Sequence, residues 1–154
     1  MKTLIDCMEV TQLAFSADEL INTEVITLTD ILEAEERFLR PILGDELIAA
    51  LHNGSYPTLL SEYVAPALAQ WTRYVSHPLF EIRSSTHDKS RHQNTYAQSK
   101  HNELMIRTLH RKAVTLSRRL SRHLNSHSDE YPEYAPEHNQ LNRCSIDGYI
   151  IQVW

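Results

Sequence analysis

The chain has 154 residues, of which 42% are hydrophobic and 23% are charged, and its formal net charge at pH 7 is −5. That length suits one domain, and the composition excludes both a wholly disordered chain and a membrane protein. Only three glycines occur, and none lies between Gly54 and Gly148, which excludes glycine-rich phosphate loops and nucleotide-binding fingerprints. The scarcity of glycine and proline favours a mainly helical chain.

Charge is distributed unevenly along the sequence. Residues 1–66 hold twelve acidic and three basic residues, a net charge of −9, whereas residues 67–128 hold three acidic and eleven basic residues, a net charge of +8. Residues 129–154 hold five acidic residues and one basic residue, which gives −4. Such a chain can bind a copy of itself head to tail, or it can offer its basic part to a polyanion.

Short helices are predicted for the first part of the chain. The apolar pattern from Leu4 to Val10 fits a helix about as well as a strand, and we interpret it as a helix. Residues 16–19, Ser-Ala-Asp-Glu, have capping-box spacing, which predicts a second short helix that ends near Thr23.

A longer helix is predicted from Leu28 onwards, because apolar residues then recur at spacings of three and four. Pro41 cannot continue the hydrogen-bond ladder, and Gly44 tolerates a left-handed turn. We therefore expect the chain to bend between Pro41 and Gly44 before a helix over residues 45–51.

The next helix is predicted to begin at Pro57, since proline is favoured in a first helical turn. Pro66 lies away from the apolar stripe of this helix, so we expect it to kink the helix without ending it. The helix is expected to end at His77–Pro78, followed by a short strand over Phe80–Arg83 and an exposed, mobile loop over residues 84–94.

The longest helix is predicted over residues 96–124, with one apolar face toward the core. That face comprises Met105, Leu109, Ala113, Leu116, Leu120 and Leu124. After Ser126 the chain is predicted to be irregular, and residues 148–154 form an apolar, β-prone tail that needs a partner strand. We expect that partner to be Phe80–Arg83 or the same segment of a neighbouring copy.

These elements predict an all-α fold: a small bundle of four to five helices with a long C-terminal helix and a short β-prone C-terminal tail. Residues 1–128 are expected to form the helical domain, and residues 129–154 an irregular acidic exit and the apolar tail. Trp154, at the end of this tail, is hard to bury alone, so we expect it to dock on its own domain or on a partner.

A basic ridge is predicted on the longest helix. Its members are Lys100, Arg107, Arg111, Arg118 and Arg122. Their spacings of seven, four, seven and four place them within an arc of about 60°, opposite the leucine face. No acidic residue lies between Leu104 and Ser128 to relieve their repulsion. Three interpretations of the ridge remain open: a solvated helix face, a surface that binds an acidic neighbouring subunit, and a surface that binds nucleic acid. If the partner is a neighbouring subunit, Glu33 and Glu36 are the candidate acidic face.

No catalytic, cofactor or metal site is predicted. The sequence contains no nucleophile elbow and no context that activates a cysteine. His123 and His127 lie one helical turn apart, the spacing that lets two imidazoles meet one ion, but no third ligand is evident. The acids Glu33, Glu35, Glu36, Asp45 and Glu46 could in principle act as general acids or bases, but Glu33 and Glu36 have the positions of the polar side of an amphipathic helix, and we interpret them as a solvated face. Trp71 and Tyr74 are expected in the core or at its edge.

Residues 31–51, ILEAEERFLRPILGDELIAAL, resemble the opening module of head-tail connector proteins (head completion or adaptor proteins) of tailed phages and prophages. The resemblance rests on Ala34-Glu35, Phe38, Pro41, Leu43-Gly44 and the short helix of residues 47–51. The later strings LLSEYVAPALAQWTRYV and AVTLSRRLSRHLNSHSDEYPEY are similar to the third helix, the last helix and the Tyr-Pro-containing exit of that family. Together these segments cover about half of the chain.

The resemblance implies a connector-like helical domain that assembles into a ring beneath the portal, through which the genome passes. It implies copies of the chain itself, portal proteins and tail proteins as partners, passing contact with DNA, and no membrane, cofactor or enzyme activity. The lone cysteines Cys7 and Cys144, with no signal-peptide pattern before them, fit a protein of the bacterial cytoplasm, or of the virion if the phage is active. The alternative is a helical nucleic-acid-binding regulator that uses the basic ridge.

Overall fold

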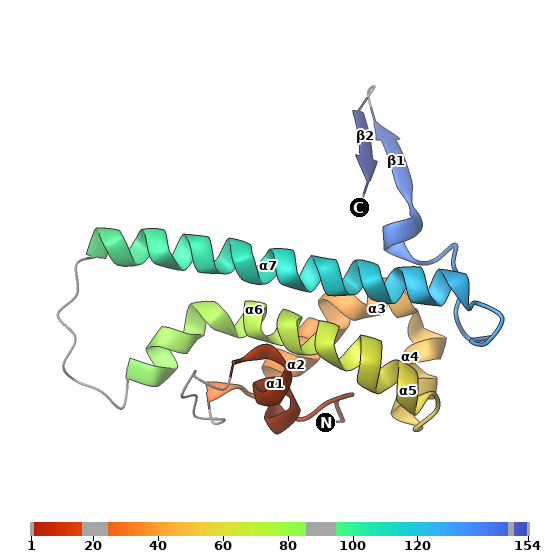
Figure 1. Cartoon of the computed structure of the whole chain (residues 1–154), viewed down its shortest axis with the longest axis horizontal. Coiled ribbons are helices and arrows are strands. Elements are labelled where there is room, and N and C mark those ends of the chain that lie inside the picture. The colour runs from red at the N-terminus through yellow and green to blue at the C-terminus, as the bar shows by residue number, and fades with distance from the viewer. Residues whose placement is uncertain (1, 17–24, 86–94, 148–149, 154) are drawn as a thin grey trace.

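The computed structural model describes residues 2–16, 25–85, 95–147 and 150–153 (Figure 1). Helices make up the body of the protein, and the longest of them is the last, so the predicted all-α class is confirmed. A two-stranded hairpin follows that helix at the C-terminal end.

The first segment forms helix α1 (Cys7–Ala14), as predicted. Asp6 begins the helix with a capping box: its carboxylate accepts a hydrogen bond from the Glu9 backbone N–H, and the Glu9 carboxylate accepts one from the Asp6 N–H, each at 2.8 Å. The helix predicted between Ser16 and Thr23 falls on residues 17–24, outside the described part of the chain.

One continuous helical run follows, made of α2 (Leu28–Ala34), the π-helical turn η2 (Glu35–Leu39) and α3 (Arg40–Leu43). The run ends at Gly44, which has φ +82° and separates α3 from α4 (Asp45–His52). The predicted bend after Pro41 is therefore confirmed, and it uses a backbone conformation that glycine adopts far more readily than other residues.

A second run is built in the same way from α5 (Pro57–Leu59), the π-helical turn η3 (Leu60–Val64) and α6 (Ala65–Ser85). Each π-helical turn ends two residues before a proline, Pro41 in the first run and Pro66 in the second. Proline lacks an N–H and its ring crowds the carbonyl four residues back, so a wider turn before it lets the helix continue. Pro66 therefore does not end the helix, as predicted.

The predicted end of this helix at His77–Pro78 is wrong. Helix α6 includes Pro78 and continues to Ser85, so Phe80–Arg83 are helical and do not form a strand. A proline inside a long helix removes one backbone hydrogen bond, but the rest of the helix keeps its hydrogen bonds. A short alternating segment without a neighbouring strand has no partner for inter-strand hydrogen bonds, so the helix is favoured here. The loop predicted over residues 84–94 begins in this helix, and residues 86–94 lie outside the described part.

Helix α7 (Thr95–Ser126) has 32 residues, which corresponds to about 48 Å, and it packs along α6 (Figure 1). Four residues of its predicted apolar face are buried, and Met105 and Leu116 are half-buried. Trp71 of α6 lies in the core beneath, where its ring stacks on Phe38 at 3.8 Å and its indole N–H donates to the Ser117 hydroxyl at 2.8 Å. The core position predicted for Trp71 is confirmed.

After α7 the chain makes turns, the short 3₁₀ helix η4 (Gln140–Asn142) and an antiparallel hairpin of β1 (Cys144–Asp147) and β2 (Ile150–Val153). The expected pairing of the tail with Phe80–Arg83 is wrong, because β2 pairs with β1 and those residues are in α6. The sequence contains a signal for this hairpin, since only Gly148 and Tyr149 separate the two strands and glycine is favoured in a two-residue connection. Trp154 lies outside the described residues.

Candidate interaction surface

The basic ridge lies along the exposed side of α7. All five members are exposed: Lys100, Arg107, Arg111, Arg118 and Arg122. Arg107 forms an ion pair of 2.5 Å with Glu103 one turn earlier, and Arg122 donates to the Arg118 carbonyl at 3.4 Å. Within the part of the chain that the structure describes, Arg111 and Arg118 have no ion-pair partner. Arg111 and Arg118 thus give the ridge positive charge that the described part of the subunit does not compensate.

A shallow depression of about 580 Å³ adjoins the ridge, between α6 and α7; we call it the α7 groove. Its lining is Tyr74, Ile106, Arg107, His110, Arg111 and Val114. Tyr74, Ile106 and Val114 are half-buried, whereas Arg107, His110 and Arg111 are exposed. The α7 groove therefore combines an apolar base with a cationic rim, a surface suited to an apolar segment that carries acidic residues.

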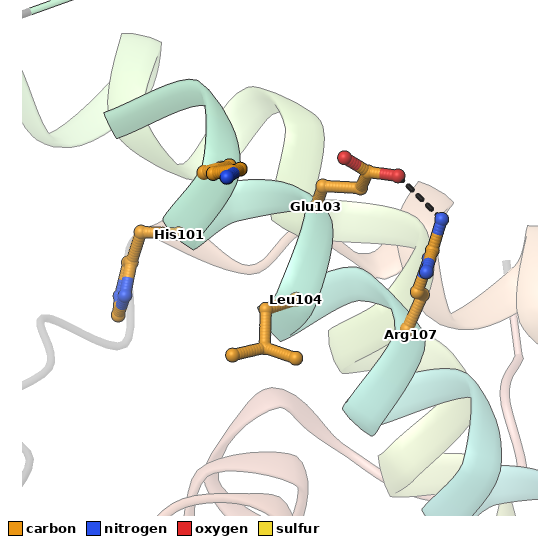
Figure 2. A pocket seen from close by; sticks show the side chains of 5 residues that line it. His101, Glu103, Leu104 and Arg107 are labelled. Atoms are coloured by element: carbon orange, nitrogen blue, oxygen red, sulfur yellow. Dashed lines mark hydrogen bonds and ion pairs between the residues drawn. The ribbon is translucent and has the colours of Figure 1, made fainter. Parts of the chain in front are cut away.

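A second depression, of about 370 Å³, lies nearer the beginning of α7 and is lined by Lys100, His101, Glu103, Leu104 and Arg107. Figure 2 shows the Glu103 carboxylate facing Arg107, while Leu104 projects from another side of the helix. The Leu104 side chain is 66% exposed. An apolar side chain this open extends the surface available to a partner toward the start of α7.

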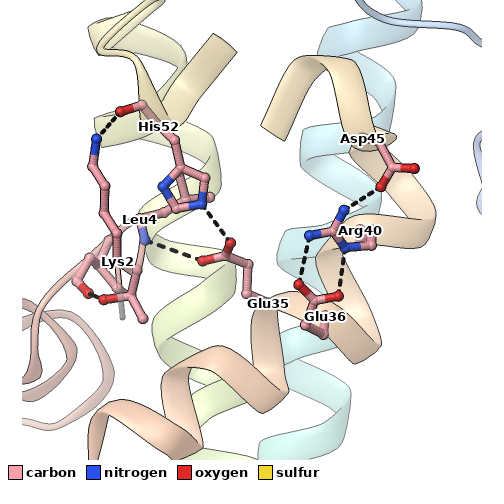
Figure 3. A network of polar contacts seen from close by, with 9 residues as sticks. Lys2, Leu4, Glu35, Glu36, Arg40, Asp45 and His52 are labelled. Atoms are coloured by element: carbon pink, nitrogen blue, oxygen red, sulfur yellow. Dashed lines mark hydrogen bonds and ion pairs between the residues drawn. The ribbon is translucent and has the colours of Figure 1, made fainter. Parts of the chain in front are cut away.

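The predicted acidic face of Glu33 and Glu36, unlike Arg111 and Arg118 of the ridge, is paired with opposite charges of its own subunit. Glu33 and Glu36 are exposed, but Glu33 pairs with Arg37 at 3.5 Å and Glu36 forms two hydrogen bonds of 2.6 Å with Arg40. Arg40 also contacts Asp45 (Figure 3). The hydrogen bonds that Arg40 donates to Glu36 and then to Asp45 raise the pKa of Arg40 above its usual value. The charge of both glutamates is therefore compensated within the subunit.

Glu35, between these two residues, is buried, whereas Glu33 and Glu36 are exposed as predicted. It is only 1% exposed, and its carboxylate accepts a hydrogen bond of 3.2 Å from the Leu4 N–H while lying 2.9 Å from Nε2 of His52 (Figure 3). Lys2 donates in turn to the His52 carbonyl oxygen. Glu35 lies four residues from both Ile31 and Leu39, on the buried stripe, and this spacing is the sequence signal for its burial. Its partners indicate a structural role in fixing the N-terminal segment.

His123 and His127 stack on each other, with ring centroids 4.5 Å apart. Nε2 of His123 lies 3.0 Å from the Tyr131 hydroxyl, and Nδ1 of His127 lies 3.0 Å from the His123 carbonyl oxygen. The His123 ring also stacks on Tyr63 of η3 at 4.0 Å. Burial and the neighbouring His127 lower the pKa of His123. Among the described residues no group of three or more potential ligands is positioned around a metal ion.

The segment between α7 and the hairpin, residues 127–143, is here called the exit segment, and it is fixed to the helices by side chains that the sequence analysis missed. The hydroxyl of buried Tyr134 donates to the Asn125 amide oxygen at 2.7 Å, and Asn139 donates to the Ser121 hydroxyl at 2.8 Å. Tyr56 donates to Glu133 at 2.7 Å. Buried tyrosines in a polar, irregular stretch gave the only sequence signal for this packing.

Three carboxylates of the exit segment face solvent instead. They belong to Asp129, Glu130 and Glu137, which are exposed and have no ion pair within the described chain. The exit segment therefore carries uncompensated negative charge, in contrast to Glu33 and Glu36.

Comparisons with known proteins found no match: no family model, no curated protein and no solved structure is significantly similar to the chain. No helix among the described residues combines the length and the hydropathy that a membrane span requires. Function is therefore inferred from the chemistry of the molecular surface.

Proposed function

We propose that the chain is a non-catalytic structural connector of a tailed phage or prophage, which assembles with copies of itself into a ring between the portal and the tail. One observation carries the proposal: among the described residues, Arg111 and Arg118 are exposed without an acidic partner on a helix about 48 Å long, while exposed, unpaired acids lie in the exit segment. Two complementary but different surfaces on one chain suit head-to-tail assembly, which closes into rings.

The resemblance of residues 31–51 to the opening module of connector proteins supports the same proposal. In the structure these residues form α2, η2, α3 and α4, with the bend at Gly44 between two helices that share the core. This helix-bend-helix unit is a packing module: of its acids, Glu33, Glu36 and Asp45 pair with arginines on its surface and Glu35 is buried against Leu4 and His52.

Nucleic-acid binding is the second candidate, and the exposed cationic ridge favours it. Arg107 to Arg122 spans about 22 Å along α7, enough to follow several phosphates of a backbone. The net charge of −5 argues against it, since modules that bind free duplex usually carry a net positive charge. In a ring connector the same arginines can meet passing DNA without tight binding by the free subunit.

Light scattering over a range of protein concentrations tests the proposal. A connector is expected to increase in mass with concentration toward a closed multiple of 17.9 kDa, and to lose mass as salt weakens the contact between charged surfaces. A chain that stays monomeric at every concentration and binds duplex DNA tightly would favour the regulator instead.

A further inference from the structure

The C-terminal hairpin is amphipathic by register. Directly paired residues lie on the same face of a two-stranded ribbon, and faces alternate along each strand. The pairs Cys144↔Val153 and Ile146↔Ile151 therefore share one face, which is entirely apolar. The pairs Ser145↔Gln152 and Asp147↔Ile150 share the other face, which is mainly polar.

The hairpin stands away from the helical body, beyond α7 (Figure 1). A two-stranded hairpin alone in water is marginally stable at best, so a ribbon with a wholly apolar face needs a surface to cover that face. The exposed acids Asp129, Glu130 and Glu137 belong to the exit segment, which connects α7 to the hairpin. Whatever covers the hairpin therefore has to be apolar and, close by, positively charged.

The α7 groove has both properties, with Tyr74, Ile106 and Val114 below and Arg107 and Arg111 at its rim. The hairpin of the same chain is too short to cover it. Asn142 is held beside Asn125 by a hydrogen bond of 2.8 Å, and His110 at the middle of the groove lies fifteen residues, or about 22 Å, back along α7. Four residues of strand span only about 13 Å.

We infer that the hairpin and the exit segment of one subunit dock on the α7 groove and the basic ridge of a second copy. This inference rests on the proposed function and names its interface. The apolar face of the hairpin covers Ile106 and Val114, and the exit carboxylates meet the arginines of the ridge. Glu33 and Glu36, already paired with Arg37 and Arg40, are not the acidic side of this contact.

The two docking surfaces are different parts of the chain, so the contact is heterologous, and a bound pair still presents one free groove on one copy and one free hairpin on the other. This property allows a test by mixing two variants that are each blocked on one side. The first variant, Val114→Glu, places a charge at the base of the groove. The second, Ile151→Lys, places a charge on the apolar face of the hairpin.

Each variant alone is expected to be monomeric at concentrations where the natural chain assembles. An equimolar mixture is expected to form a dimer and nothing larger, because the intact hairpin of the first variant fits the intact groove of the second. Gln152→Lys is the matched control: it adds the same charge one residue away, on the other face of the ribbon, and is expected to assemble normally. Arg111→Glu replaces Val114→Glu if the latter unfolds, as judged by its thermal melting.

A second arm tests the charges. Glu130→Arg with Glu137→Arg is expected to weaken assembly about tenfold or more, because reversed charges then face the ridge. Adding Arg111→Glu and Arg118→Glu to the same chain restores opposite signs and is expected to recover most of the lost affinity. Glu33→Arg with Glu36→Arg is the control and is expected to leave assembly unchanged.

The outcomes separate the inference from the proposed function. If the natural chain assembles but the mixture of blocked variants stays monomeric, the interface is elsewhere and the inference is wrong, while the connector proposal stands. If the natural chain is monomeric at every concentration, both are wrong. If Glu33→Arg with Glu36→Arg abolishes assembly and the exit variant does not, the acidic side of the contact is the predicted Glu33 and Glu36 face and the inference is overturned.

Discussion

Glu35 accepts a hydrogen bond from the backbone N–H of Leu4, a residue 31 positions earlier, and this buried contact ties the N-terminal segment to the helical run that contains η2. The same carboxylate lies 2.9 Å from His52 of α4. One acidic side chain therefore links three segments of the fold.

Glu35→Leu is expected to destabilise the fold by about 2–4 kcal/mol, because the Leu4 N–H and the His52 ring lose their acceptor in a buried place. Glu35→Gln retains an oxygen for Leu4 and is expected to cost less. Urea unfolding of both variants measures the difference, with exposed Glu33→Gln as a control expected within about 0.5 kcal/mol of the natural chain. Equal stability of Glu35→Leu and the natural chain would show that this carboxylate does not hold the segment.

Gly44→Ala is expected to cost about 1–3 kcal/mol, because φ +82° with ψ 164° is a conformation that is essentially confined to glycine. A Cβ at this position would meet no atom within 4 Å, so the cost arises from the backbone and not from crowding. Gly44→Val is accordingly expected to melt close to Gly44→Ala, and both well below the natural chain. A melting temperature unchanged by either substitution would mean that residue 44 adopts another conformation.

His123 is expected to make stability depend on pH. Its pKa in the folded chain is lowered below the ordinary value of 6.5, first by burial and then by His127. The unfolded chain therefore binds the proton more readily, so the stabilisation is fully present above about pH 6.5 and is lost as pH falls through the folded pKa. In His123→Phe, which retains an aromatic ring against Tyr63, the melting temperature is expected to fall less steeply over this range. Parallel curves for the two chains would exclude His123 as the cause.

Deleting residues 146–154 is expected to abolish assembly while leaving the melting of the helical body nearly unchanged. The strands of the hairpin pair with each other and stand apart from the helices, so we expect their loss to remove a docking element (Figure 1). Size-exclusion chromatography and thermal melting report the two properties separately. A truncated chain that elutes and melts like the full chain would contradict this role of the tail.

The salt dependence of binding to duplex DNA tests the second candidate function, that of a nucleic-acid-binding regulator. If the five residues of the ridge each neutralised a phosphate, the binding constant would fall with salt at a log-log slope of about −4.5. We expect weak binding with a smaller slope, because in the proposed ring these arginines contact another subunit. A slope near −4.5 that is reduced by Arg111→Gln and Arg118→Gln, with assembly unaffected, would favour the regulator.

The helical core was predictable because apolar residues repeat at helical spacing. Leu109, Ala113, Leu120 and Leu124 are buried as that pattern predicts, and Gly44 ends α3 because its conformation is local. Pro78 does not end α6, because the hydrogen bond that one proline removes is outweighed by those of the long helix around it. Local signals therefore predicted which segments are helices better than they predicted where α6 ends.

The surface was less predictable, because partners in space are not neighbours in sequence. The basic ridge follows from the spacing on one helix, and it is exposed as expected. The spacing of four residues also predicts that Glu33 pairs with Arg37 and Glu36 with Arg40. Part of the surface charge is therefore compensated by neighbours on the same helical run. The packing of Tyr134 and Asn139 on α7 depends on contacts across an irregular loop, for which the sequence has no periodic pattern.

The central claim is that the chain assembles through the basic ridge of α7. Its most direct test is the mass in solution, measured by light scattering at increasing concentration, for the natural chain and for the double variant Arg111→Glu with Arg118→Glu. We expect the natural chain to grow to a closed oligomer and the charge-reversed chain to stay at 17.9 kDa. A natural chain that remains at that mass at every concentration while binding DNA tightly and in a salt-sensitive way would contradict the connector.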